Sequence, residues 1–317
     1  MANLWNNNDI VVINYHRIKT SQKSHFSMFD DGVFGPDQYE FEKQMSWLKK
    51  NIQILSEEDL INVVNNKFKP SKRSVVITFD DGYIDNYTLA YPILRHYKIP
   101  AIFFIPSQTI DERCLSWWDC FAYFLKKTEK DKIVLFGERL YPKQQYEKSL
   151  SFILNLVYQN KVKDSDVYNS LCAACDVDPI SKDIQDRELM SWDQLKEVAD
   201  NGIDIGAHTH SHRILSSLNP KQQHTEIINS KKIIEQHIGR NIRSMSYPVG
   251  SYNHFTETTK KIVRKAGFDL AFSFLNGVNS CGIIDAMDIK RIGVKISLPR
   301  FVCNIELHKI FAPLNKF

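Results

Sequence analysis

The sequence contains no hydrophobic run long enough to cross a membrane. Its longest, Ile99–Pro106, has the length of a strand, whereas a membrane helix needs about 18 apolar residues. The first nine residues have neither the basic n-region nor the apolar h-region of a secretory signal peptide. We therefore expect no integral membrane segment, and a cytoplasmic protein that is at most peripheral at the inner face of the membrane.

Cysteine and excess charge are both scarce. The six cysteines are scattered over 317 residues, and reduced thiols are the default in a chain without an export signal. Cys172-Ala-Ala-Cys175 has the spacing of a metal or redox pair, but there is no second pair and the context looks helical, so buried core cysteines are favoured. The net charge of +4 is too small to indicate a nucleic-acid-binding protein.

Internal repeats, low-complexity tracts and Pro- or Gly-rich linkers are absent as well. The composition, with 43% apolar and 25% charged residues, is that of a soluble globular protein. Together these features predict a single domain over residues 1–317 that carries an insertion.

Seven short runs rich in β-branched and aromatic residues predict strands. Most are continuously apolar, as in parallel strands that helices cover on both faces. They are Ile10–Tyr15, Ser74–Phe79, Ala101–Ile105, Ile203–Ala207, Arg243–Tyr247, Leu270–Phe274 and Lys290–Val294. Helical patterns lie between them, at Pro36–Asn51, Ser56–Asn65, Ser191–Gly202, Asn219–Gly239 and Thr256–Ala266. Because strand and helix alternate, the chain is predicted to form an α/β barrel or a doubly wound sheet.

Residues 111–190 break this alternation. They contain amphipathic helical patterns, such as the apolar positions Tyr146, Leu150, Ile153, Leu154 and Val157. This stretch is predicted to be a helical insertion between two strands. Its sequence does not indicate whether it shapes a substrate groove or forms a surface for a partner.

Two adjacent carboxylates follow one predicted strand, in Ser74-Val-Val-Ile-Thr-Phe-Asp80-Asp81-Gly82. Ionised carboxylates at the end of a buried strand need a counter-charge or a metal, because burying a charge is costly. Neighbours in a strand point to opposite faces, but Gly82 lets the chain leave the pleat, so both aspartates could serve one site. A solvated Asp-Gly turn explains this segment equally well when it is taken alone.

Three histidines follow a second predicted strand, in His208-Thr-His210-Ser-His212, although the whole chain has only ten. If the chain turns helical after the strand, His208 and His212 share one face and can converge on a metal, whereas His210 points elsewhere. With one aspartate they would supply three ligands and leave positions open for water and substrate, which is typical of a catalytic divalent site. The other aspartate would then act as a base.

These motifs resemble those of the polysaccharide deacetylase family, also called the NodB-homology or carbohydrate esterase 4 family. Thr78-Phe-Asp-Asp-Gly82 matches the family's first motif and His208-Thr-x-x-His212 its second. Ser246-Tyr-Pro-Val-Gly250 matches the third in part, since the family often has Arg in place of Ser246 and an aromatic residue in place of Val249. Tyr15-His16 is similar to the start of the subgroup that acts in surface-polysaccharide assembly.

The resemblance covers about residues 10–110 and 190–300. It implies a distorted (β/α) barrel, usually of seven strands, and a metal-dependent enzyme.

Site residues are also implied by this resemblance. Asp81, His208 and His212 are the expected metal ligands, and Asp80 is the general base that deprotonates the attacking water. A backbone N–H near Val249 is expected to stabilise the oxyanion together with the metal. The third motif, which contributes Tyr247, Pro248, Val249 and Gly250, is thus the expected substrate and oxyanion segment. An Asp-His-His set accepts Zn²⁺, Co²⁺, Ni²⁺ or Mn²⁺, and we expect one Zn²⁺ ion.

Two further roles are assigned to His16 and Arg291. The family usually takes its general acid from a late Leu-x-His motif, but His308 stands in Ile305-Glu-Leu-His308 and is expected on the surface. His16 is therefore the preferred acid, with a substrate-binding or supporting histidine as the alternative. Arg291 is expected to replace the family's missing arginine and to orient Asp80 with its guanidinium. The alternative is an outward Arg291 that is paired on the surface.

The sequence thus predicts a metal-dependent hydrolase that removes an N-acyl group, in the first place acetyl, from an amino sugar in a glycan or lipid-linked polysaccharide intermediate. N-deformylation at the same site is one alternative, and a degenerate barrel that binds carbohydrate without catalysis is another. A two-metal phosphoesterase would need more Asp, Asn or His ligands than these motifs supply. The expected partner is the N-acylated amino-sugar glycan or lipid-linked glycan, and binding to nucleic acid is not expected. The sequence does not indicate the oligomeric state.

Overall fold

A computed structural model describes residues 9–20, 27–294 and 297–311 of the chain. These residues divide into two compact units. The first unit contains the N-terminal strands, residues 34–111 and the chain from residue 190 onward, and the second contains residues 27–33 and 112–189. None of the described helices is both long and apolar enough to span a bilayer.

The first unit is built on seven parallel strands, at the seven places that the sequence predicts. They are β1 (Asp9–Tyr15), β5 (Ser74–Asp80), β6 (Ile102–Ile105), β9 (Asp204–Ala207), β10 (Ser244–Ser246), β11 (Leu270–Phe272) and β13 (Arg291–Gly293). Their order is β11-β10-β9-β6-β5-β1-β13. Ile289, just before β13, forms a parallel bridge with Phe272 of β11, so the two edges of the sheet are linked. The distorted seven-stranded barrel is therefore confirmed.

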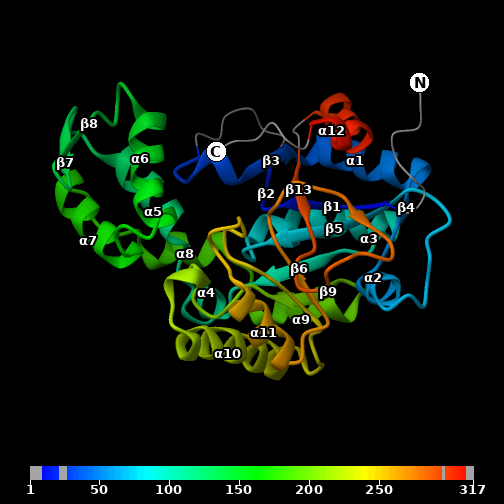
Figure 1. The fold of residues 1–317 in the computed structure, drawn as a ribbon. Coiled ribbons are helices and arrows are strands. Elements are labelled where there is room, and N and C mark those ends of the chain that lie inside the picture. Colours follow the sequence, from blue (N-terminus) through cyan, green and yellow to red (C-terminus); the bar gives the residue numbers. More distant parts are fainter. Residues whose placement is uncertain (1–8, 21–26, 295–296, 312–317) are drawn as a thin grey trace. The chain divides into compact units, whose positions relative to one another are not determined.

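Helices cover the outside of this sheet, as Figure 1 shows for α1, α9 and α10. The helices of the unit are α1 (Gln38–Asn51), α2 (Glu57–Val64), α3 (Tyr91–Tyr97), α4 (Ser107–Glu112), α9 (Trp192–Asp200), α10 (Pro220–Ile238), α11 (Glu257–Lys265) and α12 (Leu298–Phe311). Local sequence defines their ends: a capping box opens α10 at Asn219, and Gly239 ends it in the left-handed conformation. The five helices expected from the sequence are all present.

Shorter elements complete the first unit. They are the strands β2 (Arg17–Lys19), β3 (Phe34–Asp37), β4 (Gln53–Ile54) and β12 (Asn279–Ser280), a π-helical turn at Asn86–Ala90 and a 3-10 turn at Leu215–Ser217. Both faces of the central strands are buried, and every residue of β1 and β5 lies in the interior. Strands buried on both faces explain why these runs are continuously apolar in the sequence.

The second unit is mainly helical. Its elements are α5 (Trp117–Lys127), α6 (Tyr146–Tyr158), α7 (Asp164–Cys175), α8 (Lys182–Glu188), the hairpin β7 (Ile133–Leu135) with β8 (Glu138–Leu140), and a 3-10 turn at Asp31–Val33. Residues 27–33 belong to this unit because Lys126 donates to the Phe29 carbonyl and Asp119 accepts from the Asp30 N–H. This earlier segment was not part of the predicted insertion, residues 111–190. Cys175 is buried in α7, as expected, and Cys172 is partly exposed.

A buried carboxyl group lies at the beginning of α2. Glu57 is 7% exposed and accepts a hydrogen bond from the Ser244 hydroxyl. Burial, with the negative charge of nearby Asp204, raises the pKa of Glu57 to about 7 from its ordinary 4.5. Because its pKa is higher in the folded chain than in the unfolded one, the protonated carboxyl stabilises the fold below about pH 4.5, and this stabilisation is lost as the pH rises to about 7.

Glu57→Gln is therefore expected to make unfolding less pH-dependent. An amide carries no charge to desolvate, so the variant should be more stable than the parent at pH 8, by up to about 3 kcal/mol. Urea unfolding at pH 5 and pH 8 measures both effects. An unchanged pH dependence in the variant would show that Glu57 titrates normally.

Candidate functional site

The two aspartates occupy a sharp turn at the end of β5. Asp81 has a φ of 79° and Gly82 a φ of 70°, both in the left-handed region. Such a conformation is uncommon for a residue other than glycine and requires support from its surroundings. At Gly82 a Cβ atom would also lie 3.1 Å from Ile110 Cδ1. The chain thus leaves the pleat one residue earlier than Gly82, and Asp80 and Asp81 are both turned toward the histidines.

The loop His208–His212 follows β9 and is not helical. Its backbone turns through Thr209 (φ 63°) and His212 (φ 54°), two more residues in the left-handed region. The helical turn considered for this spacing is therefore wrong, because residues in the left-handed region do not continue a right-handed helix. His208 and His212 nevertheless converge, whereas His210 turns away and places its Nδ1 2.9 Å from the Ser107 hydroxyl.

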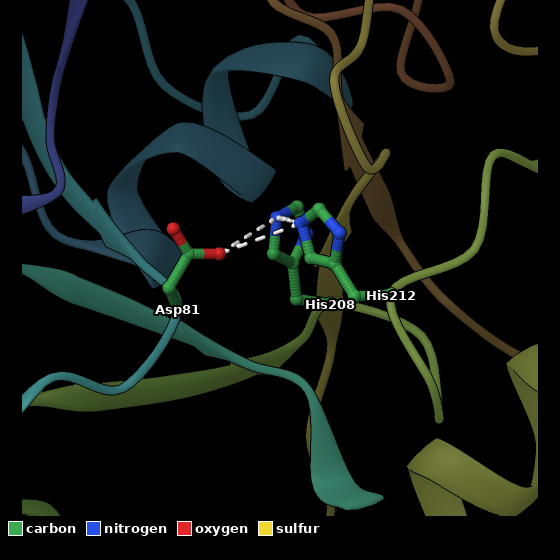
Figure 2. Close-up of side chains that lie close together, drawn as sticks. All are labelled: Asp81, His208 and His212. Carbon is green, nitrogen blue, oxygen red and sulfur yellow. Dashed lines mark hydrogen bonds and ion pairs between the residues drawn. The ribbon is translucent and has the colours of Figure 1, made fainter. Parts of the chain in front are cut away.

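Asp81, His208 and His212 form a compact cluster of buried donor atoms (Figure 2). Asp81 Oδ1 lies 3.6 Å from His208 Nε2 and 3.4 Å from His212 Nε2, and the two Nε2 atoms are 3.1 Å apart. Ligands at about 2.0–2.2 Å from a tetrahedral ion are separated by roughly 3.3–3.6 Å. The two distances from Asp81 lie in this range and the distance between the two Nε2 atoms is slightly shorter, so one metal ion fits between the three donors after a small adjustment.

The protonation states of the histidines also suit a metal. The Nδ1 of His208 lies 2.8 Å from the Ser246 carbonyl oxygen, which accepts the Nδ1 proton and leaves the Nε2 lone pair facing Asp81. Burial lowers the pKa of His208, against the opposing effect of Asp80, and lowers the pKa of His212 well below its ordinary value. Neutral imidazoles are the form that binds divalent metals. The three side chains therefore fit a divalent ion such as Zn²⁺.

Asp81→Ala and His208→Ala are each expected to abolish stoichiometric metal binding, together with any activity that depends on it. Each variant removes one of the three clustered donors. Metal content after dialysis, measured by mass spectrometry, tests the prediction. His210→Ala, in the same loop, is the control and should retain the metal. Full occupancy in both donor variants would exclude this cluster as the site.

Asp80 is held by Arg291, as the sequence analysis expects. The guanidinium donates from Nη1 to Oδ1 at 2.8 Å and from Nη2 to Oδ2 at 2.9 Å. Both side chains are almost completely buried, at 1% and 2% exposure. Burial alone would raise the pKa of Asp80, but Arg291, followed by His208 and His16, holds it well below its ordinary value. The alternative of an outward Arg291 is thus excluded, and Asp80 is an ionised carboxylate beside the donor cluster.

Strand register explains why these side chains meet. Val12 is paired with Arg291 and Asn14 with Thr78, so side chains two residues apart on β1, β5 and β13 point into the barrel together. Asn14 bridges the pair, since its Nδ2 donates to Asp80 Oδ2 at 3.1 Å and its Oδ1 accepts from Arg291 Nη1 at 2.8 Å. Asn14 was not among the predicted site residues. The available signal was a polar residue within the otherwise apolar core of β1, which must be hydrogen-bonded when buried.

His16 follows β1 and lies at the edge of the same site. Its Nε2 is 4.0 Å from Asp80 Oδ2, and its ring meets Phe274 edge-on with the centroids 6.1 Å apart. Burial lowers the pKa of His16 to about 4, although Asp80 opposes this shift. The imidazole is therefore neutral at pH 7. His308 is on α12, and its side chain lies outside the described residues.

The third motif forms a tight loop after β10. Val249 (φ 60°) and Gly250 (φ 67°) are both left-handed, and a Cβ atom at Gly250 would lie 2.6 Å from the Phe274 backbone nitrogen. No described residue accepts a hydrogen bond from the Val249 N–H. The Tyr247 side chain is buried, donates to the Met287 carbonyl and stacks on Phe255, so it packs within the barrel wall.

Comparisons with known proteins agree with this geometry. A family model described as Polysaccharide deacetylase matches residues 67–271. YxkH of Bacillus subtilis (strain 168) is 27% identical over 242 residues, 76% of this chain and 59% of that protein. Poly-beta-1,6-N-acetyl-D-glucosamine N-deacetylase of Staphylococcus aureus is 35% identical over 115 residues, 34% of this chain and 39% of that protein. The chain thus matches about three fifths and two fifths of the length of these relatives.

Solved structures share the fold. The chain is similar to the Streptococcus pyogenes deacetylase PplD, with a TM-score of 0.63 and 18% identity over 94% of this chain and 98% of that one. It is also similar to IcaB from Ammonifex degensii, with a TM-score of 0.59 and 18% identity over 95% of this chain and 97% of that one.

Proposed function

The chain belongs to the polysaccharide deacetylase family, and from this premise we propose that it removes the N-acetyl group of an amino sugar in a glycan or lipid-linked polysaccharide intermediate. One observation carries the proposal: an ionised, arginine-held carboxylate, Asp80, lies beside a three-donor metal cluster at the carboxyl ends of barrel strands. Active sites of (β/α) barrels lie at that end. Amide hydrolysis needs both components, because water must lose a proton and the carbonyl oxygen must gain negative charge.

The metal centre would be formed by Asp81, His208 and His212, and we propose Zn²⁺ as its ion. A divalent ion held there polarises the amide carbonyl and lowers the pKa of water. The two imidazoles would bind it as neutral ligands, because burial lowers their pKa values. His208 keeps its orientation through its Nδ1–H bond to Ser246.

The reacting protons would be handled by Asp80 and His16. The Asp80 carboxylate accepts a proton from the attacking water, and the Val249 N–H donates to the developing oxyanion. The amide C–N bond then breaks, and the leaving nitrogen takes up a proton to become the free amine of the sugar. His16 is neutral before the reaction and lies 4.0 Å from Asp80 Oδ2, so it is placed to receive that proton and to pass it to the amine.

His16→Ala is expected to lower kcat by roughly 10²–10⁴, the range typical of a lost general acid. His308→Ala is the comparison and should change kcat by less than threefold. Steady-state kinetics of both variants at saturating metal test the assignment. A raised KM with an unchanged kcat for His16→Ala would instead identify a substrate-binding histidine.

The substrate class is best tested by measuring acid release. The Staphylococcus aureus relative is named for poly-β-1,6-N-acetylglucosamine, so oligomers of that glycan head a panel that includes lipid-linked and nucleotide-linked N-acetylamino sugars. We expect metal-dependent acetate release from at least one of them, abolished by Asp81→Ala. Formate released from N-formylated analogues without acetate release would favour a deformylase. Binding without hydrolysis by the metal-loaded protein would favour a carbohydrate-binding barrel.

A further inference from the structure

The metal-donor loop, His208–His212, has a backbone that must be held in place. It supplies two of the three donors and contains two left-handed residues, Thr209 and His212. Residues other than glycine persist in this conformation only when the surrounding structure holds them there. The separation of the two Nε2 atoms therefore depends on whatever fixes the loop.

The first support comes from the beginning of α4. The Ser107 N–H donates to the Thr209 carbonyl at 3.2 Å, and the Gln108 N–H donates to the His210 carbonyl at 2.8 Å. These bonds hold the carbonyl groups of the loop. They leave its N–H groups to be satisfied from elsewhere.

The second support is a single carboxylate on α10. Glu226 Oε2 accepts from the N–H of His210 at 3.1 Å and from the N–H of Ser211 at 2.8 Å, and its Oε1 accepts from the Ser211 hydroxyl at 2.6 Å. Hydrogen bonds to an ionised acceptor are stronger than those between neutral groups. The two bonded amides lie between the metal donors His208 and His212 in the chain.

We propose that Glu226 is a positioning residue of the metal centre, which holds the donor loop so that His208 and His212 present their Nε2 atoms to one ion. The inference rests on the proposed metal site and deepens it. Groups that orient metal ligands without touching the metal change its affinity by 10–100-fold when they are removed. The same range is expected for Glu226.

Three substitutions of Glu226 distinguish the effect of its hydrogen bonds to the loop from the effect of its negative charge. Glu226→Ala removes all three bonds. Glu226→Asp keeps the charge but is one methylene too short to reach the loop amides. Glu226→Gln keeps the reach without the charge, since its oxygen can accept from the N–H groups of His210 and Ser211 while its amide nitrogen donates to the Ser211 hydroxyl.

A matched control is available on the same helix. Glu235 of α10 also accepts from a loop amide, that of Ile242, and pairs with Lys231. Glu235→Gln removes the same charge and alters the same kind of contact at a distance of nine residues along the helix. It should leave the metal centre unchanged.

The experiment measures Zn²⁺ affinity by calorimetry on the chelator-stripped full chain, and amide hydrogen exchange of residues 208–212 in the metal-free protein. We expect Kd to rise 10–100-fold in Glu226→Ala and Glu226→Asp, by less than about fivefold in Glu226→Gln, and not at all in Glu235→Gln. Exchange at Ser211 should be faster in the first two variants only.

The exchange measurement keeps this inference separate from the proposed function. If the parent chain binds no Zn²⁺, the metal site is wrong, and exchange still decides whether Glu226 holds the loop. If Glu226→Ala does not fold, Glu226→Asp and Glu226→Gln carry the comparison. Parent-like Kd and exchange in Glu226→Asp would overturn the inference.

Discussion

Replacing Asp80 with Asn is expected to lower kcat by roughly 10²–10⁴ while the metal stays bound. The loss is large because an amide cannot accept the proton that the attacking water must give up. The metal should stay because Asp80 is not one of the clustered donors: its Oδ2 is 3.9 Å from His208 Nε2, whereas Asp81 Oδ1 is within 3.6 Å of both histidines.

The measurement needs to separate chemistry from folding. Asp80→Asn also removes the counter-charge of a buried guanidinium, so the variant should unfold more easily than the parent. Kinetics should therefore be measured well below its melting temperature, on protein whose metal content has been determined. Loss of the metal together with activity would mean that the roles of Asp80 and Asp81 are exchanged. Parent-like kcat with bound metal would remove Asp80 from the mechanism.

Most of the barrel could be predicted because its signals are local. Strands buried on both faces leave continuous apolar runs, and capping residues mark helix ends, so all seven strands and five of the helices between them were visible in the chain, whereas α3 and α4 were not predicted. Residues 27–33 were not assigned to the second unit because their contacts, such as that of Asp30 with Asp119, join segments far apart in sequence.

The residues of the donor set could be predicted from the sequence, but their geometry could not. Residue types and spacing indicated one aspartate together with His208 and His212, and the family resemblance selected Asp81. Neither predicted the left-handed turns that bring these residues together, since several backbone paths join residues four apart. Asn14 was missed because its partners lie on β5 and β13, far away in the chain. Networks of this kind follow from strand register, which single strands do not encode.

Arg291 was predicted because the third motif lacks an arginine. The family's arginine is missing at Ser246, and a buried carboxylate such as Asp80 still requires a cation. Arg291 comes from β13 instead, and its Nη2 donates to the Ser246 hydroxyl at 2.8 Å. A small side chain at position 246 thus accommodates a guanidinium that arrives from another strand.

Every donor of this guanidinium is used. Nε donates to the Ser273 carbonyl, Nη1 to Asn14 and Asp80, and Nη2 to Asp80 and Ser246. A guanidinium has five N–H groups, so none is left over. Lysine has neither the planar fork nor this number of donors, and Arg291→Lys should not substitute for it.

Arg291→Met is accordingly expected to destabilise the fold by about 3–5 kcal/mol, because it leaves the Asp80 carboxylate buried without a counter-charge. Arg17→Met is the matched control: Arg17 also pairs with a buried aspartate, Asp85, at 2.8 Å. Both variants should show a comparable loss in urea unfolding. Only Arg291→Met should also lower kcat by more than tenfold, since Arg17 does not contact Asp80.

The pH dependence of kcat/KM should distinguish Arg291→Met from Arg17→Met. In the parent chain Arg291 keeps the pKa of Asp80 well below its ordinary value, so the charged pair stabilises the fold above about pH 4 and is lost only as the pH falls through that lowered pKa. Without the guanidinium, burial dominates and raises the pKa of Asp80. The acid limb of kcat/KM should then move to higher pH in Arg291→Met and stay in place in Arg17→Met. An acid limb at the same pH in all three proteins would mean that the base titrating in the reaction is not Asp80.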